Sequence, residues 1–114
     1  MQLLPEIIAL ISIGLGLFGW LAPRYTMEVI DLHPGTTPMG PSEVRAASGA
    51  LFVGLGVAVL VLQEDAALAT LGFAWGGAAI GRATSLVLDG QTRKKWTFFI
   101  VEAVVAAMAL VIAL

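Results

Sequence analysis

Two long apolar runs joined by a short polar turn decide the fold of this chain. Residues 44–62 read VRAASGALFVGLGVAVLVL, residues 63–65 read QED, and residues 66–88 read AALATLGFAWGGAAIGRATSLVL. A helix that crosses the roughly 30 Å hydrocarbon core of a bilayer needs about 20 mainly apolar residues, and each run has that length. This stretch therefore predicts two antiparallel transmembrane helices joined by a tight turn.

Another apolar run lies on each side of this hairpin. We therefore expect four transmembrane helices, at residues 3–22, 44–62, 66–88 and 96–114. A long connection, residues 23–42, contains Pro34, Pro38 and Pro41, and a short polar link spans residues 89–95. The whole chain, residues 1–114, is thus predicted to form a single domain: an all-α membrane protein, folded as a four-transmembrane-helix bundle.

The composition indicates that lipid is the main surrounding of this chain. Of its 114 residues, 59% are hydrophobic and 12% are charged, against roughly 25% charged residues in soluble domains. The absence of cysteine excludes disulfides and thiolate chemistry. The net charge of −2, with no basic stripe, predicts no nucleic-acid partner. We expect the first run to remain as a helix and not to be cleaved as a signal peptide, because no Lys or Arg precedes it.

The basic residues predict the orientation in the membrane. With four crossings, both termini and the turn at residues 63–65 share one side, and the two other connections share the opposite side. Most of the basic residues belong to the second side: Arg24, Arg45, Arg93, Lys94 and Lys95. The interfacial aromatic residues Trp20, Tyr25 and Trp96 mark the same side. The positive-inside rule therefore places the two longer connections in the cytoplasm and both termini outside.

Small residues four apart predict where the helices touch, because helices in lipid associate through close backbone approach. The second helix has the longest row: Ser42, Ala46, Ala50, Gly54 and Ala58. The other helices have shorter rows: Ser12 and Gly16; Gly72 and Gly76; Gly77, Gly81 and Ser85; Ala103 and Ala107. We expect these faces to pack within one bundle. The alternative is that one of them forms a homo-oligomer or contacts another membrane protein.

Five charged residues in or near the membrane form the candidate site: Glu43, Arg45, Arg82, Asp89 and Glu102. A charge at mid-membrane costs ~3 kcal/mol on insertion scales, so it usually has a partner inside the protein. Arg82 lies about six residues from the cytoplasmic end of its helix and Glu102 equally far into the next, roughly 9 Å deep. Because a short link joins these two helices, we predict an Arg82–Glu102 ion pair.

Two interpretations of the charged residues remain open. In the first, Arg82, Glu102 and Glu43, together with Asp89, form a buried ion network that fixes the helix register. In the second, they line a polar pocket that opens to the cytoplasm and binds a lipid headgroup, an anionic metabolite or a proton. A further alternative is a small transporter or proton-coupled carrier that uses Glu102 and Arg82. The outer half lacks the polar residues and broken helices of an alternating-access route, which favours a pocket.

No combination of side chains in the sequence is typical of a catalytic centre. There is no serine with a histidine base, no pair of histidines at ligand spacing, and no carboxylate cluster beside a histidine. The single histidine, His33, lies in a Pro/Gly-rich stretch, and we interpret it as a solvated loop residue. We therefore expect no enzymatic activity, no catalytic residue, no metal site and no cofactor.

A series of polar and glycine motifs resembles a known family. In chain order these are Ser42-Glu43-Val44-Arg45, Gly49, Gly54-Leu55-Gly56, Gly81-Arg82, Ser85-Leu86, Asp89-Gly90 and Glu102. They are similar to motifs of the small bacterial four-helix membrane proteins grouped as domain-of-unknown-function family 4345. The resemblance covers the second to fourth helices and departs at Ser48 and Ala50, where an aromatic residue and a glycine are expected. It implies a multi-pass protein of the bacterial inner (plasma) membrane and no particular activity.

The expected function is therefore that of a non-enzymatic inner-membrane protein with both termini periplasmic. Its charged cluster is either structural or binds a lipid headgroup or another small polar ligand. Its partners are the lipid bilayer and, through the small-residue faces, other membrane proteins or further copies of the chain.

Overall fold

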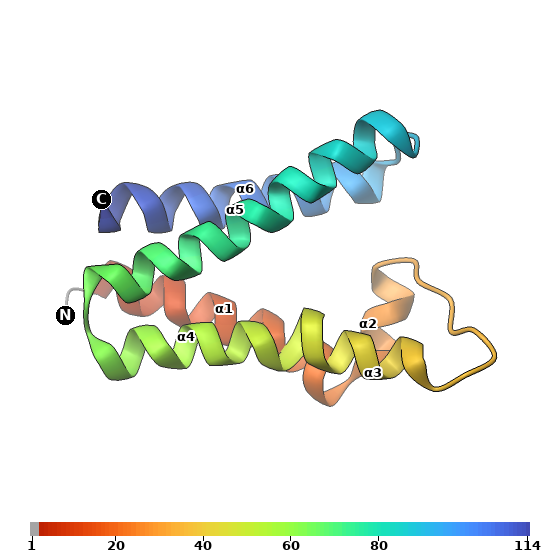
Figure 1. Ribbon diagram of the computed structural model, residues 1–114, viewed down its shortest axis with the longest axis horizontal. Coiled ribbons are helices and arrows are strands. Elements are labelled where there is room, and N and C mark those ends of the chain that lie inside the picture. The colour runs from red at the N-terminus through yellow and green to blue at the C-terminus, as the bar shows by residue number, and fades with distance from the viewer. Residues whose placement is uncertain (1–2) are drawn as a thin grey trace.

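The computed structural model describes residues 3–114 and contains the four expected long helices (Figure 1). They are α1 (Leu3–Leu21), α5 (Asp65–Leu88), α6 (Arg93–Ala113) and a composite helix from Met39 to Leu62. The composite helix consists of α3 (Met39–Arg45), the π-helical turn η1 (Ala46–Ala50) and α4 (Leu51–Leu62). All four are long and apolar enough to cross a membrane, and the described residues form no strand. The predicted fold class, an all-α four-helix membrane bundle, is confirmed.

The second and fourth helices begin earlier than expected. The composite helix starts at Met39 and so includes Pro41, which is tolerated because the first N–H groups of a helix have no intrahelical partner. Helix α6 starts at Arg93, because the side chain of the preceding Thr92 accepts a hydrogen bond from the backbone N–H of Lys95 at 3.1 Å. Residues 39–43 thus extend the second helix, and the basic residues 93–95 extend the fourth.

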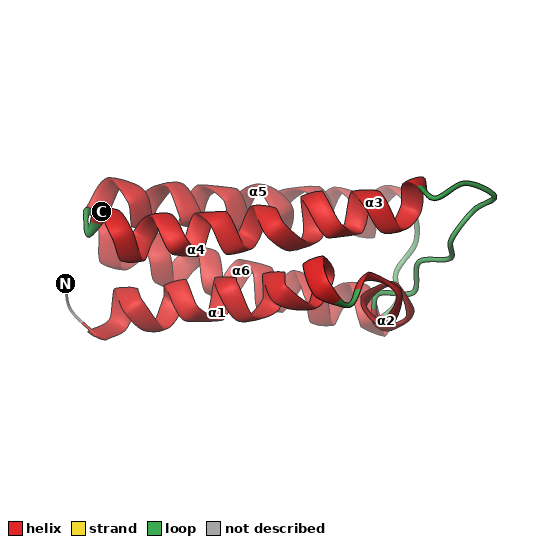
Figure 2. Cartoon of the chain, turned by 90° about the horizontal axis from the view of Figure 1, so that it is seen from below, coloured by secondary structure: helices red, strands yellow, loops and turns green. Residues whose placement is uncertain are grey.

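The long connection contains a short helix that the sequence analysis did not predict, α2 (Pro23–Val29). Pro23 opens it, since the fixed φ of proline and its missing N–H suit the first helical position. The hydroxyl of Thr26 donates to the carbonyl of Ala22 at 2.9 Å. Helix α2 crosses the end of the bundle, where Figure 2 shows it end-on. It therefore turns the chain sideways before the loop that leads to α3.

The bundle consists of two helix pairs. Helix α1 packs along the composite helix, and α5 packs along α6 (Figure 1). The turn at Gln63 and Glu64 joins the pairs, with Gln63 in the left-handed conformation at φ 57°. At this end, which we call the turn end, the pairs lie close together. At the opposite end, called the loop end, α5 diverges from the composite helix.

The apolar core lies between the two pairs, mostly in the half near the turn end. Its members are Ile8, Ala9, Val59, Leu68, Leu71, Trp75, Val105, Ala106 and Ala109. The largest of these aliphatic side chains are fully buried, which makes the turn end a closed apolar interface. Trp75 lies at the boundary of this core, close to the middle of α5.

Helix α1 and the composite helix touch backbone to backbone through glycines. A Cβ atom at Gly49 would collide with the backbone N of Trp20, and one at Gly56 would lie 2.5 Å from the carbonyl oxygen of Ala9. The row predicted to make this contact does not make it: Ala46 is exposed, and Gly54 faces open space. That prediction is wrong: Gly49 and Gly56, which lie seven residues apart, make the contact, and Gly54 lies on another face of the same helix.

Only one of the two glycine faces of α5 is covered. Gly72 packs against Leu110 and Ala109 of α6, whereas Gly77 and Gly81 face open space. On α6 the buried small residues are Ala106 and Ala109 instead of the predicted Ala103 and Ala107. The face with Gly77 and Gly81 is thus uncovered within the described part of the chain.

Candidate ligand-binding cavity

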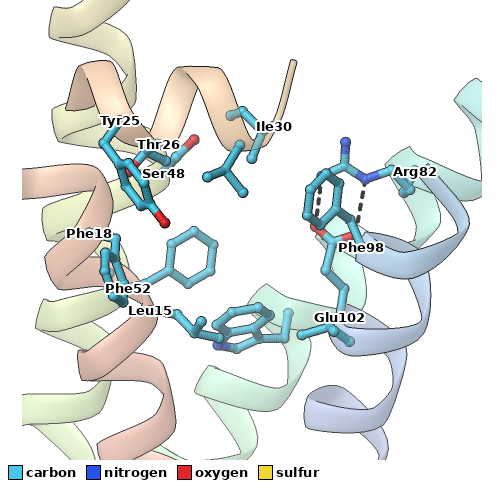
Figure 3. A pocket seen from close by; sticks show the side chains of 14 residues that line it. Leu15, Phe18, Tyr25, Thr26, Ile30, Ser48, Phe52, Arg82, Phe98 and Glu102 are labelled. Atoms are coloured by element: carbon cyan, nitrogen blue, oxygen red, sulfur yellow. Dashed lines mark hydrogen bonds and ion pairs between the residues drawn. The ribbon is translucent and has the colours of Figure 1, made fainter. Parts of the chain in front are cut away.

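Where the two helix pairs diverge, they border an open-sided cavity of about 380 Å³ (Figure 3). One wall comes from α1, α2, η1 and α4, and the other from α5 and α6. The lining residues are Leu15, Gly16, Phe18, Tyr25, Thr26, Val29, Ile30, Ser48, Phe52, Trp75, Arg82, Phe98, Val101 and Glu102. The cavity therefore occupies the loop-end half of the bundle, directly beyond the apolar core.

The predicted Arg82–Glu102 ion pair is confirmed, and it lines this cavity. The guanidinium Nε donates to Oε1 of Glu102 at 3.1 Å, and Nη2 donates to Oε2 at 3.0 Å. This is the bidentate geometry that makes arginine–carboxylate pairs strong. The Glu102 side chain is 12% exposed, and the Arg82 side chain is 36% exposed. The link between α5 and α6 is short enough to place both residues at the same level.

The guanidinium of Arg82 keeps free hydrogen-bond donors at the cavity wall. An arginine side chain has five N–H donors, and the two bonds to Glu102 engage only Nε and Nη2. Nη1 donates to no residue in the described part of the chain, and Figure 3 shows one guanidinium nitrogen directed away from the carboxylate. The guanidinium carbon also lies 5.6 Å from the centre of the Phe98 ring. The pair therefore presents unused donors beside an aromatic surface.

The other three predicted site residues do not join this pair. Glu43, Arg45 and Asp89 are all exposed at the loop end and lie outside the cavity lining. Nη1 of Arg45 donates to the carbonyl of Trp20 at 2.7 Å, which ties the composite helix to the end of α1. The first interpretation, a buried network in which Glu43 and Asp89 join Arg82 and Glu102, is wrong, because charges at helix ends can reach water and headgroups without a buried partner.

The wall that faces the ion pair carries hydroxyl groups that the sequence analysis did not select. Tyr25 and Thr26 come from α2, and Ser48 comes from η1; Figure 3 shows the three gathered across the cavity from Arg82. The Thr26 hydroxyl donates to a backbone carbonyl within its own helix, which leaves Tyr25 and Ser48 free to meet a ligand. Spacing alone could not reveal them, since they depend on α2 and on the π-helical turn.

Aromatic side chains are concentrated around the cavity. The chain has three Trp, one Tyr and five Phe, and the aromatic lining residues are Phe18, Tyr25, Phe52, Trp75 and Phe98. The rings of Phe52 and Trp75 lie 4.7 Å apart between centroids, and those of Phe18 and Tyr25 lie 6.2 Å apart. The cavity lining is therefore rich in aromatic side chains, with aliphatic residues between them and one ion pair on its wall.

A polar contact forms the floor of the cavity. Nε1 of Trp75 donates to the hydroxyl of Ser12 at 3.2 Å, and this hydroxyl donates to the carbonyl of Phe52 at 2.9 Å. Ser12 is fully buried. Among the described residues, the Trp75–Ser12 bond is the one side-chain hydrogen bond that joins the two helix pairs. It fixes the level at which the closed core ends and the cavity begins.

The ionisable residues outside the cavity show no arrangement suited to metal binding. Over residues 3–114, no group of three or more His, Asp or Glu side chains is placed to hold an ion. The His33 side chain is 90% exposed, and its Nε2 lies 3.8 Å from Oδ1 of Asp31. This agrees with a solvated loop residue.

The fold and the cavity together define a class: a small all-α membrane bundle with a polar-tipped aromatic cavity between two helix pairs. The chain belongs to the family described as "Domain of unknown function (DUF4345)", whose model matches residues 1–113. This is the family that the polar motifs resemble, and the match also includes the first helix and the long connection. Neither a curated protein nor a solved structure matches this chain.

Proposed function

We propose that this protein is a non-enzymatic membrane protein that binds a small lipophilic molecule with a polar head in the cavity between its helix pairs. The observation that carries the proposal is the Arg82–Glu102 pair, which faces an aromatic cavity while retaining free donors. Ligand pockets typically have volumes of roughly 300–1,000 Å³ and are mostly apolar with a few polar groups. A cavity of about 380 Å³ fits a small ligand of this kind.

A purely structural role explains less of this arrangement. An ion pair that only fixes helix register needs packed neighbours on every side, because voids beside it forfeit dispersion contacts. The Arg82 side chain instead remains 36% exposed and borders the cavity. The position of the pair therefore supports a binding role.

The lining also supports access from the bilayer. Phe18 of α1 and Val101 of α6 belong to the cavity wall and are 55% and 40% exposed, respectively. In a membrane bundle, exposed apolar side chains at this level face lipid. A molecule dissolved in the bilayer would then enter sideways, between α1 and α6, without crossing the turn-end core.

The closed turn end argues against a carrier that uses Glu102 and Arg82. A transport route needs polar groups on both sides of the membrane midplane. Here the half near the turn end is filled by Ile8, Leu68 and Leu71, each almost completely buried. A cavity that opens at one level favours binding over transport.

We place the protein in the inner (plasma) membrane of a bacterium, with the loop end in the cytoplasm and both termini in the periplasm. Support comes from the basic residues of the loop end and from the family resemblance. The test uses the cysteine-free chain with Gln63→Cys or Gln91→Cys in intact cells. We expect an impermeant maleimide to label only the cysteine at position 63, and labelling of position 91 alone would contradict this orientation.

Small residues that no helix of the chain covers leave room for a partner in the membrane. Gly54, Gly77 and Gly81 all face open space at their Cβ positions. Close approach of a second helix is possible at such positions. They support contact with a second copy or with another membrane protein.

Tryptophan fluorescence tests the binding function directly. In a Trp20→Phe/Trp96→Phe variant, Trp75 at the cavity floor is the one remaining tryptophan. We expect 10-bromodecanol, added to nanodiscs, to quench Trp75 in a saturable manner, with its hydroxyl at Arg82 and its bromine near the floor. Val101→Phe fills the cavity and should abolish the saturable phase. Val104→Phe, on the same helix but outside the lining, should retain it. Linear quenching in every variant would overturn the proposal.

A further inference from the structure

The geometry points to the class of ligand: an uncharged, planar ring that carries oxygen acceptors and an apolar tail, the chemistry of a quinone headgroup. This inference rests on the proposed function and specifies the molecule that the cavity accepts. Three features carry it: the charge balance of the cavity wall, the hydrogen-bonding groups that face the cavity, and the aromatic lining.

The charge balance favours an uncharged head. Arg82 and Glu102 neutralise each other through two short hydrogen bonds, and no other lining residue has a formal charge. A carboxylate, phosphate or ammonium group in the cavity would therefore add a charge without a counterion. Such a charge is strongly disfavoured in a low-dielectric site, because desolvation is compensated only by a partner of opposite sign. An uncharged head avoids this cost.

The hydrogen-bonding groups favour acceptors on the ligand. Both carboxylate oxygens of Glu102 already accept a bond from Arg82, while Nη1 of Arg82 has no acceptor among the described residues. The hydroxyls of Tyr25 and Ser48 on the opposite wall can each donate as well. A ring with carbonyl oxygens on opposite edges would match a donor on each wall.

The aromatic lining favours a ring over an alkyl chain. Phe52 and Trp75 form a tilted pair at the floor, with Phe18 and Tyr25 on one wall and Phe98 on the other. Aromatic rings gain more from offset or edge contacts with another ring than from area burial alone. A cavity of about 380 Å³ also suits one substituted ring, with the tail leaving between Phe18 and Val101 toward lipid.

The test measures affinity for four ligands whose alkyl chains have nine or ten carbons. A tritiated decyl-benzoquinone is bound to the wild-type protein in nanodiscs and displaced by unlabelled quinone, decanol, decanoate or decylammonium. We expect the quinone to displace at concentrations at least about tenfold lower than the other three. Tighter displacement by decanoate or decylammonium would overturn the ring assignment and leave the proposed binding function intact. If the labelled quinone does not bind and 10-bromodecanol quenches without saturation, both the ring assignment and the proposed binding function are contradicted.

A charge variant tests separately whether Glu102 neutralises Arg82 at the cavity wall. Glu102→Gln removes the carboxylate charge and leaves Arg82 as an uncompensated cation at the cavity wall. We expect decanoate to bind the variant at least about tenfold more tightly than it binds the wild type, because the cation now has no counterion in the protein. Equal decanoate affinity in the two proteins would contradict the argument. Circular dichroism confirms that the variant is folded.

A ring variant tests the aromatic argument. Phe52→Leu removes one ring from the cavity floor, and Phe73→Leu removes one from the exposed, non-lining face of α5. We expect Phe52→Leu to weaken quinone binding about fivefold and decanol binding by a clearly smaller factor, while Phe73→Leu changes neither. Equal loss of quinone and decanol binding in Phe52→Leu would show that the ring supports the cavity shape alone, and would contradict ring recognition.

Discussion

The two halves of this bundle bring the same two helix pairs together in different ways. Near the turn end the pairs meet through fully buried aliphatic side chains such as Leu68 and Leu71. Near the loop end they separate around a cavity with an ion pair on its wall. The difference shows how a chain of 114 residues can hold a polar group in the membrane. The turn-end half provides the apolar packing, and the loop-end half holds the cavity.

The largest expected effect concerns the glycine contact that joins α1 to the composite helix. Gly49→Ala places a Cβ against the backbone of Gly19 and Trp20, so α1 and the composite helix must move apart. We expect a loss of about 4 kcal/mol or more in the free energy of unfolding, at the upper end for point substitutions. Unfolding by SDS, followed by circular dichroism, measures this loss.

Gly54→Ala is the matched control for that substitution. A Cβ at Gly54 meets nothing within 4 Å, and alanine is about 1 kcal/mol more favourable than glycine in a helix. The control should therefore be neutral or slightly stabilising. Equal destabilisation by both substitutions would contradict the glycine contact with α1.

A pair of leucine substitutions tests the difference between the halves directly. Leu71 is fully buried in the turn-end core, whereas Leu15 lines the cavity and is exposed. We expect Leu71→Ala to cost about 2–5 kcal/mol, and Leu15→Ala to cost less than about 1 kcal/mol because it opens no new void. The same SDS titration measures both. If the two substitutions cost the same, the halves are packed alike and the comparison fails.

Charge exchange tests the ion pair of the loop-end half. Arg82→Glu or Glu102→Arg alone places two like charges together, and we expect each to cost about 1–3 kcal/mol, a value reduced by the partial exposure of Arg82. The double exchange should recover part of the loss, because it restores the pair with its direction reversed. Additive losses in the double variant would show that the two side chains do not interact in the bilayer.

The smallest expected effect concerns the boundary between the halves. Ser12→Ala removes the acceptor of the Trp75 N–H and leaves this buried donor unpaired. We expect a loss of about 1–2 kcal/mol and a shift in Trp75 fluorescence. Ser85→Ala on α5 is the control, since this side chain forms no hydrogen bond with a described residue. If Ser12→Ala changed neither the free energy of unfolding nor the Trp75 fluorescence, the floor of the cavity would not depend on this bond.

The sequence predicted the fold and the ion pair because both depend on local features. Run length determines the helices, and a short link forces α5 and α6 to be antiparallel neighbours, so residues at equal depth such as Arg82 and Glu102 meet. The contact face of the composite helix was not predictable, because small residues occur on more than one of its faces and spacing alone does not select Gly49 and Gly56 over Gly54. Glu43 and Asp89, which were grouped with the pair from the sequence, instead lie exposed at helix ends.

The cavity itself could not be predicted from the sequence. It depends on the angle between the helix pairs and on α2, which folds from a stretch whose prolines indicated a loop. Tyr25 and Ser48 have no spacing pattern that links them to Arg82. Tyr25 and Ser48 lie opposite Arg82 because of how the two helix pairs are arranged in space. The periodicity of a single helix carries no information on that arrangement.

The Arg82–Glu102 pair has a mechanical consequence, because both residues belong to the same helix pair. Every lining residue on the α1–α4 wall is uncharged, so the ion pair lies within one wall and does not bridge the two. Moving the walls apart would break the Trp75–Ser12 bond and apolar contacts, and would separate no charges. Only short-range contacts therefore hold the two walls together. If the walls move apart, both charged residues move with α5 and α6.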